Sequence, residues 1–287
     1  MKNFLLSCVV PFKDYVVLHE NLLKSLIEFT DCVEVILVHD TKLRLNDAQI
    51  DFLKSIPAEV TYISGEYKSA AKARNEGLAR ARGEWIIFWD SDDYGFTDEV
   101  LGVIKGAGSN ELVICDFRVT ESIQGNVNQF SSGRLDLRQL VRTPGIWRHI
   151  FRRKLIGETR FQDIRLGEDI LFLVECGAYE KQILFSEEIV YEYRLSSSQA
   201  TKNMDLSIEL KRFLNELSKS LQVQQPISPV PYGIYIRQTV ALILHNKGKY
   251  LIKYLKDIFN LYRRLGRDPK RIFRKSIIIA LAKKGLT

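Results

Sequence analysis

Glu84-Trp85-Ile86-Ile87-Phe88-Trp89-Asp90-Ser91-Asp92-Asp93 is the stretch that decides the fold. Its apolar first half is typical of a buried strand. Three carboxylates follow within four residues, where they repel one another and are costly to desolvate. A hard divalent cation offsets that cost, and a diphosphate fills the coordination sites that the protein leaves open. The stretch therefore predicts a nucleotide-diphosphate site, with a solvated acidic turn as the alternative interpretation.

The flanking sequence alternates strand-like and helix-like segments. Apolar runs that predict strands occur at 5–10, 33–38 and 60–63, and helical spacing is found around 46–56 and 69–82. This alternation predicts an α/β fold with a mostly parallel sheet flanked by helices. Pro11, Asp40 and Asp92 fall at the carboxyl ends of the predicted strands, where such sheets bind ligands.

An ordered series of short motifs carries a family resemblance through the first two thirds of the chain. The chain resembles the family 2 glycosyltransferases with the GT-A fold, which include bacterial enzymes of polysaccharide, capsule and O-antigen biosynthesis. The motifs are Val10-Pro11-Phe12, the strand end at Asp40, Ala73-Arg74-Asn75-Glu76-Gly77, Ala81-Arg82-Gly83-Glu84-Trp85-Ile86, Asp90-Ser91-Asp92-Asp93, Gly167-Glu168-Asp169-Ile170-Leu171-Phe172 and Tyr191-Glu192-Tyr193-Arg194.

Three regions are expected along the chain, the first two from the resemblance and the third from composition. Residues 1–116 are expected to form a Rossmann-like α/β half that binds the nucleotide sugar. Residues 117–221 are expected to form the acceptor-binding and catalytic-base half of the same GT-A domain. Residues 222–287 are expected to be a linker, placed at Gln222–Pro231 by its three prolines, followed by a basic amphipathic helical extension.

Most of the implied functional residues lie on the donor side. Asp92 resembles the metal-binding Asp of the DxD motif, with Mn²⁺ or Mg²⁺ as the implied cofactor. The other implied donor-site residues are Pro11, Phe12, Asp40, Arg74, Asp90 and Asp93, with Asp40 bonding the nucleotide base and Pro11 and Phe12 packing on it. Phe12-Lys13 and His39-Asp40-Thr41-Lys42 depart from the family's usual Tyr-Asn and Asp-Asp-Gly-Ser, which leaves the identity of the base open.

Glu168-Asp169 resembles the family's ED motif, in which the Asp is the catalytic base. Transfer of a sugar to a hydroxyl group needs a positioned carboxylate that takes the proton of that hydroxyl, and this contributes about 10²–10⁴-fold to the rate. The alternative is a structural helix start, where acidic residues are stabilised by the exposed backbone amides. Both interpretations hold together, because an apolar helix-like run follows Asp169.

The acceptor side is marked by an aromatic and basic stretch at 145–153 and by Arg194. Trp147 can stack on a sugar face, and a buried core position is the alternative for this indole. Arg194 is assigned to the acceptor side as well, close to the diphosphate.

Composition favours a cytoplasmic enzyme. The chain has 287 residues of which 46% are hydrophobic, which is enough for one large core or two modest ones. Its four cysteines are dispersed without a CxxC pair, as in reduced cytosolic proteins. The apolar N-terminal run lacks a cleavage site and is needed as the first strand, so it is not expected to be a signal peptide.

The positive charge is concentrated at the C-terminus. From Asn246 to Thr287, thirteen Lys and Arg residues stand against two Asp, and apolar residues recur on one helical face. This pattern predicts peripheral binding to an anionic membrane, here the inner face of the plasma membrane. A basic helix packed on the protein is the alternative. Nucleic acid is not an expected partner, because no binding motif accompanies the charge.

The resemblance implies a metal-dependent glycosyltransferase of the hexosyl or N-acetylhexosaminyl class, and the resemblance and the logic of a single displacement together imply inversion. The expected partners are a nucleotide-diphosphate sugar donor and a glycan or lipid-linked acceptor. Two alternatives remain open. A nucleotidyltransferase on a similar sheet usually has a glycine-rich loop after the first strand, whereas this chain has Pro11-Phe12-Lys13-Asp14. A non-catalytic glycan-binding or scaffold relative is disfavoured by the presence of both carboxylate motifs.

Overall fold

The chain is described by a computed structural model. The structure describes residues 4–20, 22–23, 32–123, 126–131, 135–195, 205–226 and 228–246. The basic tail expected to bind a membrane lies outside these residues, apart from Asn246 at its start. None of the helices in the described ranges combines the length and the apolarity needed to cross a membrane.

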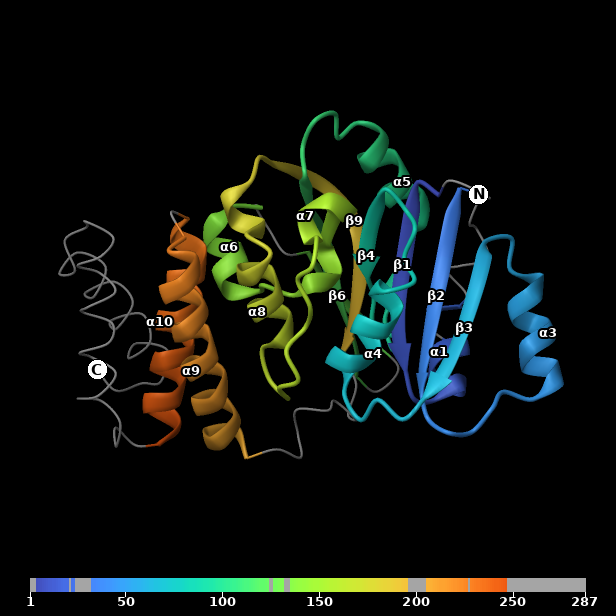
Figure 1. Ribbon diagram of the computed structural model, residues 1–287, viewed down its shortest axis with the longest axis horizontal. Coiled ribbons are helices and arrows are strands. Elements are labelled where there is room, and N and C mark those ends of the chain that lie inside the picture. The colour runs from blue at the N-terminus through green and yellow to red at the C-terminus, as the bar shows by residue number, and fades with distance from the viewer. Residues whose placement is uncertain are drawn as a thin grey trace.

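A nine-stranded mixed sheet forms the centre of the molecule (Figure 1), and its strand order is β3-β2-β1-β4-β8-β6-β9-β5, with β7 paired to β6. The parallel half consists of β1 (Leu6–Phe12), β2 (Val33–Asp40), β3 (Glu59–Gly65) and β4 (Trp85–Phe88). The other half consists of β5 (Tyr94–Gly95), β6 (Leu112–Ile123), β7 (Asn126–Ser131), β8 (His149–Arg152) and β9 (Ile183–Leu195). The mostly parallel α/β sheet expected from the sequence is confirmed, and β8 runs antiparallel to both of its neighbours, β4 and β6.

Helices cover both faces of this sheet. They are α1 (Tyr15–Glu20), α3 (Asp47–Ser55), α4 (Ala70–Leu78), α5 (Thr97–Lys105), α6 (Leu137–Arg142), α7 (Arg153–Ile156), α8 (Glu168–Glu175), α9 (Leu206–Gln224) and α10 (Pro229–His245), with short 3-10 turns at Ile146–Arg148 and Ala178–Glu180. Successive residues of β1 point to opposite faces, as the pleat requires. Val9 therefore joins the core under α4, α8, α9 and α10, whereas Cys8 and Val10 join the core under α1, α3 and α5.

The two C-terminal helices pack on the rest of the fold. α9 lies against α8, and α10 lies against α9 and α6 (Figure 1). The linker expected at 222–231 is shorter in the structure, because α9 continues through Gln224 and α10 begins at Pro229. Proline is tolerated there because the first helical turn has no use for its missing N–H. Ser228 caps this turn by accepting a hydrogen bond from the N–H of Val230 at 3.4 Å.

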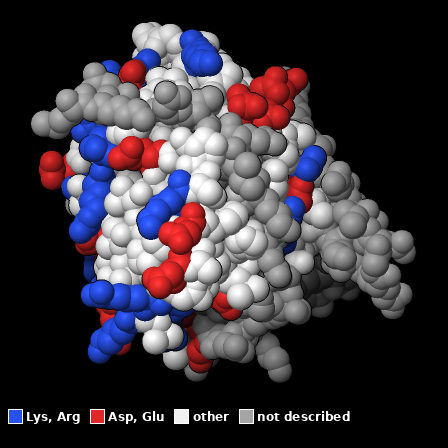
Figure 2. Space-filling model, turned by 90° about the vertical axis from the view of Figure 1, so that its right-hand side faces the viewer, with Lys and Arg blue, Asp and Glu red and all other residues white. Residues whose placement is uncertain are grey.

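The end of the molecule formed by β3 and α3 carries charges of both signs side by side (Figure 2). Two exposed ion pairs are typical of it: Lys54–Asp51 at 2.9 Å on α3 and Lys42–Glu66 at 3.1 Å between the segments that follow β2 and β3. Exposed pairs of this kind contribute little to stability. A carboxylate such as Asp51 can therefore be removed with little effect on the fold.

Candidate functional site

Asp40 organises the segment that follows β3. Its Oδ1 atom accepts hydrogen bonds from the backbone N–H groups of Tyr67 and Lys68, both at 2.7 Å. Its Oδ2 atom lies 3.4 Å from Nζ of Lys13, and the side chain of Asp40 is almost completely buried. Asp40, the residue expected to bind the nucleotide base, therefore lies at the carboxyl edge of the sheet. Its Oδ2 atom faces the exposed ammonium group of Lys13.

Phe12 and His39 form a stacked pair beside Asp40, with ring centroids 4.2 Å apart and an interplanar angle of 9°. The His39 ring bonds the Tyr62 hydroxyl through Nδ1 at 2.9 Å and the Lys13 carbonyl through Nε2 at 3.1 Å. Burial lowers the pKa of His39. Phe12 is 3% exposed, so its ring contributes to the wall of the site rather than to an open surface. Pro11 lies one residue earlier on the same strand.

The three carboxylates after β4 have different environments. Asp93 is 2% exposed, and both of its oxygens are engaged by β9: Oδ1 accepts from the N–H of Arg194 at 2.7 Å, and Oδ2 accepts from the Tyr191 hydroxyl at 2.5 Å. Burial and the neighbouring charge of Asp90 raise the pKa of Asp93 to about 8. Asp90 is half-buried and Asp92 is exposed. Asp93 therefore fixes the turn, and Asp90 and Asp92 are the carboxylates of this turn that remain accessible.

Arg74 on α4 joins the two acidic motifs. Its Nη2 atom lies 2.7 Å from Oδ1 of Asp90, and its Nη1 atom lies 3.0 Å from Oε1 of Glu168. Although burial lowers the pKa of Arg74, the carboxylates of Asp90 and Glu168 raise it above its usual value. From the sequence, Arg74 is expected to bind the nucleotide. In the structure it pairs with two carboxylates, Asp90 and Glu168, which are far apart in the chain.

Asn75 was not identified from the sequence, although it stands in the same motif. Its side chain donates from Nδ2 to the carbonyl of Phe161 and accepts from the N–H of Phe161, both at 2.8 Å. The Phe161 ring stacks on Phe172 of α8 with centroids 4.0 Å apart. Arg74 and Asn75 together therefore hold the segment that leads into Glu168. The sequence around Asn75 shows only an asparagine next to an arginine, and this pair also occurs in helices that carry no functional site.

Asp169 lies in the first turn of α8. This helix begins after Gly167, whose φ of +80° favours glycine, and a Cβ at this position would lie 2.4 Å from the Phe213 ring of α9. Burial and the charge of Glu168 raise the pKa of Asp169 to about 7, against the opposing effect of Arg74. A carboxylate with this pKa can accept a proton at neutral pH.

The donor set after β4 fits a hard divalent cation. Desolvation by the surrounding protein and the charge of Asp90 raise the pKa of Asp92, so the ionised form of Asp92 is destabilised even though Arg74 pairs with Asp90. A cation bound by Asp92, and by the Oδ2 atom of Asp90 that Arg74 leaves free, would relieve this repulsion. Within the described ranges no group of three or more His, Cys, Asp or Glu side chains converges on one point, so most ligands would come from a diphosphate and water.

The residues assigned to the acceptor lie on the β9 side of the same turn. Trp147 is half-buried and stacks on Tyr191 at 4.7 Å between centroids and on Tyr193 at 5.9 Å. Arg194 bonds Glu192 through Nε at 2.9 Å. The structure therefore brings Trp147 and Arg194 to the DxD turn, and the ring contacts that it gives Trp147 are with the protein's own aromatic side chains.

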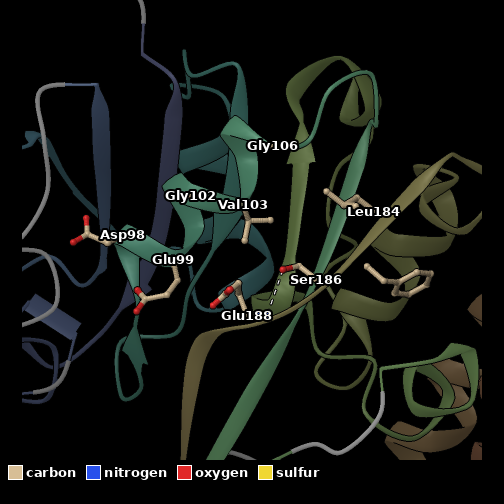
Figure 3. Close-up of a pocket in the computed structure, with 9 residues that line it drawn as sticks. Asp98, Glu99, Gly102, Val103, Gly106, Leu184, Ser186 and Glu188 are labelled. Atoms are coloured by element: carbon tan, nitrogen blue, oxygen red, sulfur yellow. Dashed lines mark hydrogen bonds between the residues drawn. The ribbon is translucent and has the colours of Figure 1, made fainter.

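A groove on another part of the surface lies between α5 and β9 (Figure 3). Asp98, Glu99 and Glu188 contribute its acidic groups, and Ser186 accepts a hydrogen bond from the N–H of Glu188 at 3.3 Å. None of the residues predicted to bind donor or acceptor lines it. The candidate site is therefore the carboxyl edge of the sheet and not this groove.

Two bacterial relatives are similar in sequence to this chain. The uncharacterized glycosyltransferase EpsJ of Bacillus subtilis is 26% identical over 221 residues, which is 69% of this chain and 63% of the relative. The putative glycosyltransferase EpsH of the same organism is 23% identical over 245 residues, which is 79% of this chain and 65% of the relative. The matches thus span slightly less than two thirds of each relative's length.

Solved glycosyltransferase structures share the fold. Residues 1–349 of TarS from Staphylococcus aureus, in complex with UDP-GlcNAc, superpose with a TM-score of 0.61 at 16% identity, covering 83% of this chain and 71% of TarS 1–349. The mannosyltransferase PcManGT from Pyrobaculum calidifontis, in complex with GDP-Man and Mn²⁺, superposes with a TM-score of 0.52 at 15% identity, covering 100% of this chain and 88% of PcManGT. The architecture is therefore that of the GT-A glycosyltransferases.

A protein-family model also matches this chain. It is described as glycosyl transferase family 2 and matches residues 7–182, more than half of the chain. The matched segment includes Asp40, Arg74, the carboxylates of 90–93 and Glu168-Asp169. This chain belongs to glycosyl transferase family 2.

Proposed function

We propose that this chain transfers a hexosyl or N-acetylhexosaminyl group from a nucleotide-diphosphate donor to a hydroxyl group of a glycan or lipid-linked acceptor. The transfer inverts the anomeric configuration, depends on a divalent metal and serves cell-surface polysaccharide synthesis. The observation that carries the proposal is the double ion pair of Arg74, at 2.7 Å to Asp90 and 3.0 Å to Glu168. Through these two ion pairs, Arg74 keeps the proposed metal-binding motif close to the proposed catalytic-base motif.

The proposed roles follow from the environments of the carboxylates. Glu168 is occupied by Arg74, whereas Asp169 has a pKa of about 7, so Asp169 is the group that takes the proton of the acceptor hydroxyl. The hydroxyl oxygen then forms a bond to the anomeric carbon as the bond to the diphosphate oxygen breaks, and the configuration inverts in this single displacement. Asp40 bonds the nucleotide base from the neighbouring strand.

Asp92, with the free oxygen of Asp90, would hold the divalent cation. When bound, the cation neutralises the charge that grows on the leaving diphosphate. Asp93 takes no part in that contact, because its two oxygens are bonded to β9. Its role is to keep Asp90 and Asp92 in place.

The similar structures support the donor class. TarS 1–349 is described with UDP-GlcNAc and PcManGT with GDP-Man and Mn²⁺. Both donors are nucleotide-diphosphate sugars, and one is accompanied by a divalent metal. They differ in base and sugar, so the donor of this chain has to be found by a screen.

The test is a Mn²⁺-dependent hydrolysis screen over UDP-, GDP- and dTDP-sugars, with binding of each donor measured in parallel. We expect one nucleotide to be released by the wild type, and release to be lost in Asp92→Ala and in Asp169→Asn. Asp169→Asn should still bind the donor with Mn²⁺, whereas Asp92→Ala should not. Asp51→Ala removes an exposed carboxylate from α3 and serves as the matched control.

Two outcomes would contradict the proposal. Release of pyrophosphate from a nucleoside triphosphate and a sugar phosphate would identify a nucleotidyltransferase. Absence of both turnover and metal-dependent binding for every sugar nucleotide would favour a non-catalytic relative.

A further inference from the structure

The hydroxyl group of Tyr191 contacts both ends of the turn that carries the DxD carboxylates. It donates a hydrogen bond to Oδ2 of Asp93 at 2.5 Å and accepts one from the backbone N–H of Asp90 at 3.3 Å. Tyr191 lies on β9 and is fully buried. One phenol oxygen therefore closes a four-residue turn, and the exposed carboxylate of Asp92 lies between its two attachment points.

The backbone of β9 adds a further bond to the same turn. Oδ1 of Asp93 accepts from the N–H of Arg194, three residues after Tyr191. With both oxygens of Asp93 bonded to β9, the turn can shift only if β9 shifts or if these bonds break. The hydroxyl of Tyr191 is the one side-chain group in this pair of bonds, so it can be removed without changing the backbone.

The ring of Tyr191 is in turn held by Trp147. The two rings are nearly parallel, with centroids 4.7 Å apart and an interplanar angle of 9°. Phe117 packs edge-on against the same indole at 4.5 Å. Gly145 leaves room for the indole, because a Cβ at that position would lie 2.4 Å from the Trp147 ring. The position of the phenol thus depends on an aromatic stack that begins outside the DxD motif.

We propose that Tyr191 is a positioning residue for the metal-binding carboxylates and that Trp147 acts through it. In this arrangement Trp147 orients Tyr191, Tyr191 orients the turn, and the turn aims Asp92 and Asp90 at the cation. The inference rests on the proposed function for the presence of a metal at Asp92. It assigns Trp147 to the support of the donor site, in place of direct stacking on an acceptor sugar.

The experiment measures binding of Mn²⁺ to the full chain by electron paramagnetic resonance, in the presence of UDP, GDP or dTDP and without turnover. Tyr191→Phe keeps the ring and its stack but removes both hydrogen bonds. We expect the Kd for Mn²⁺ to rise by about 10–100-fold, the usual effect of losing a group that orients metal ligands. Trp147→Leu should raise the Kd in the same direction, and Trp147→Phe should restore part of the loss.

Ser220→Ala on α9 is the matched control, because it removes a buried hydroxyl that donates to Oε1 of Glu175 at 2.8 Å, and neither residue is assigned to the donor or the metal. Its Kd for Mn²⁺ should stay within about twofold of the wild type, since it leaves the hydrogen bonds that orient the metal ligands intact. The melting temperature of each variant without metal separates a loss of folded protein from a loss of metal affinity.

Each result has a defined meaning. A higher Kd for Mn²⁺ in folded Tyr191→Phe supports the inference. An unchanged Kd in Tyr191→Phe would overturn it and leave the proposed function standing. If the wild type binds no Mn²⁺ with any of the three nucleotides, the donor site itself is overturned, and the inference falls with it.

Discussion

At the scale of single residues, the pKa of Asp169 sets the expected pH dependence of the reaction. Burial and Glu168 raise this pKa to about 7. A general base acts in its ionised form, so the rate should be low below this pH and should rise as Asp169 loses its proton. We expect kcat/KM for the identified donor to increase with a midpoint near 7. A rate that does not change between pH 5 and pH 8 would contradict this role for Asp169.

Arg74 should shift that midpoint. Its positive charge favours the ionised form of Asp169, so its loss should raise the pKa of the base. Arg74→Gln is therefore expected to move the midpoint of the pH–rate profile to higher pH and to lower the rate at neutral pH. Arg74→Lys keeps the charge without the two-pronged geometry and should shift the midpoint less. A midpoint that stays in place in Arg74→Gln would show that Arg74 does not act on Asp169.

These residues also show what the sequence could and could not predict. Asp92 and Asp169 stand in short local patterns, so their types and positions were visible in the chain. The partnership of Arg74 with Glu168 joins residues 94 positions apart, and the bond from Tyr191 to Asp93 spans 98. Such pairs depend on how the elements pack, and no local pattern encodes them.

At the scale of elements, the close approach of α4 to the sheet places Arg74. A Cβ on Gly77 would lie 2.5 Å from Cγ1 of Val9 and 3.2 Å from Cγ2 of Val38, and both valines are fully buried. Valine side chains are stiff, so Gly77→Ala should push the helix outward. We expect the free energy of unfolding in urea to fall by about 1–3 kcal/mol, less a gain of up to about 1 kcal/mol in helix propensity.

Gly102→Ala on α5 is the matched control for this substitution. No atom lies within 4 Å of the Cβ that it would add, and the position is exposed. The same chemical change should therefore raise the free energy of unfolding by about 0.5–1 kcal/mol. If the two variants change stability by the same amount, the contact of α4 with the sheet is not tight.

Element positions followed from hydrophobic patterning in the first half of the chain and less well in the second. The apolar runs at 5–10, 33–38, 60–63 and 84–88 correspond to β1–β4. The four-residue strand β8 was not predicted, because its residues His149–Arg152 were read only as part of an aromatic and basic stretch. Its antiparallel pairing with β4 and β6 joins segments that are far apart in the chain, so only the tertiary structure shows it.

At the scale of the whole molecule, the concentration of positive charge after Asn246 leads to a prediction about membranes. Each Lys or Arg near an anionic surface contributes about 1 kcal/mol to binding. Replacing Arg263, Arg264 and Arg267 by Gln should therefore weaken binding to anionic vesicles by up to about 100-fold, measured by flotation. Neutral vesicles are the control. Equal recovery with anionic and neutral vesicles would favour a helix packed on the protein.

The contact between Phe213 and Gly167 has a consequence for modularity. The ring of Phe213 fills the space that a side chain at Gly167 would occupy, so α9 supports the turn that presents Asp169. The family match ends at residue 182, before α9 begins. A hybrid that exchanged only the matched segment with that of a relative would combine the Gly167 turn of one protein with the α9 helix of the other. The smallest unit that can be exchanged intact therefore extends through α9.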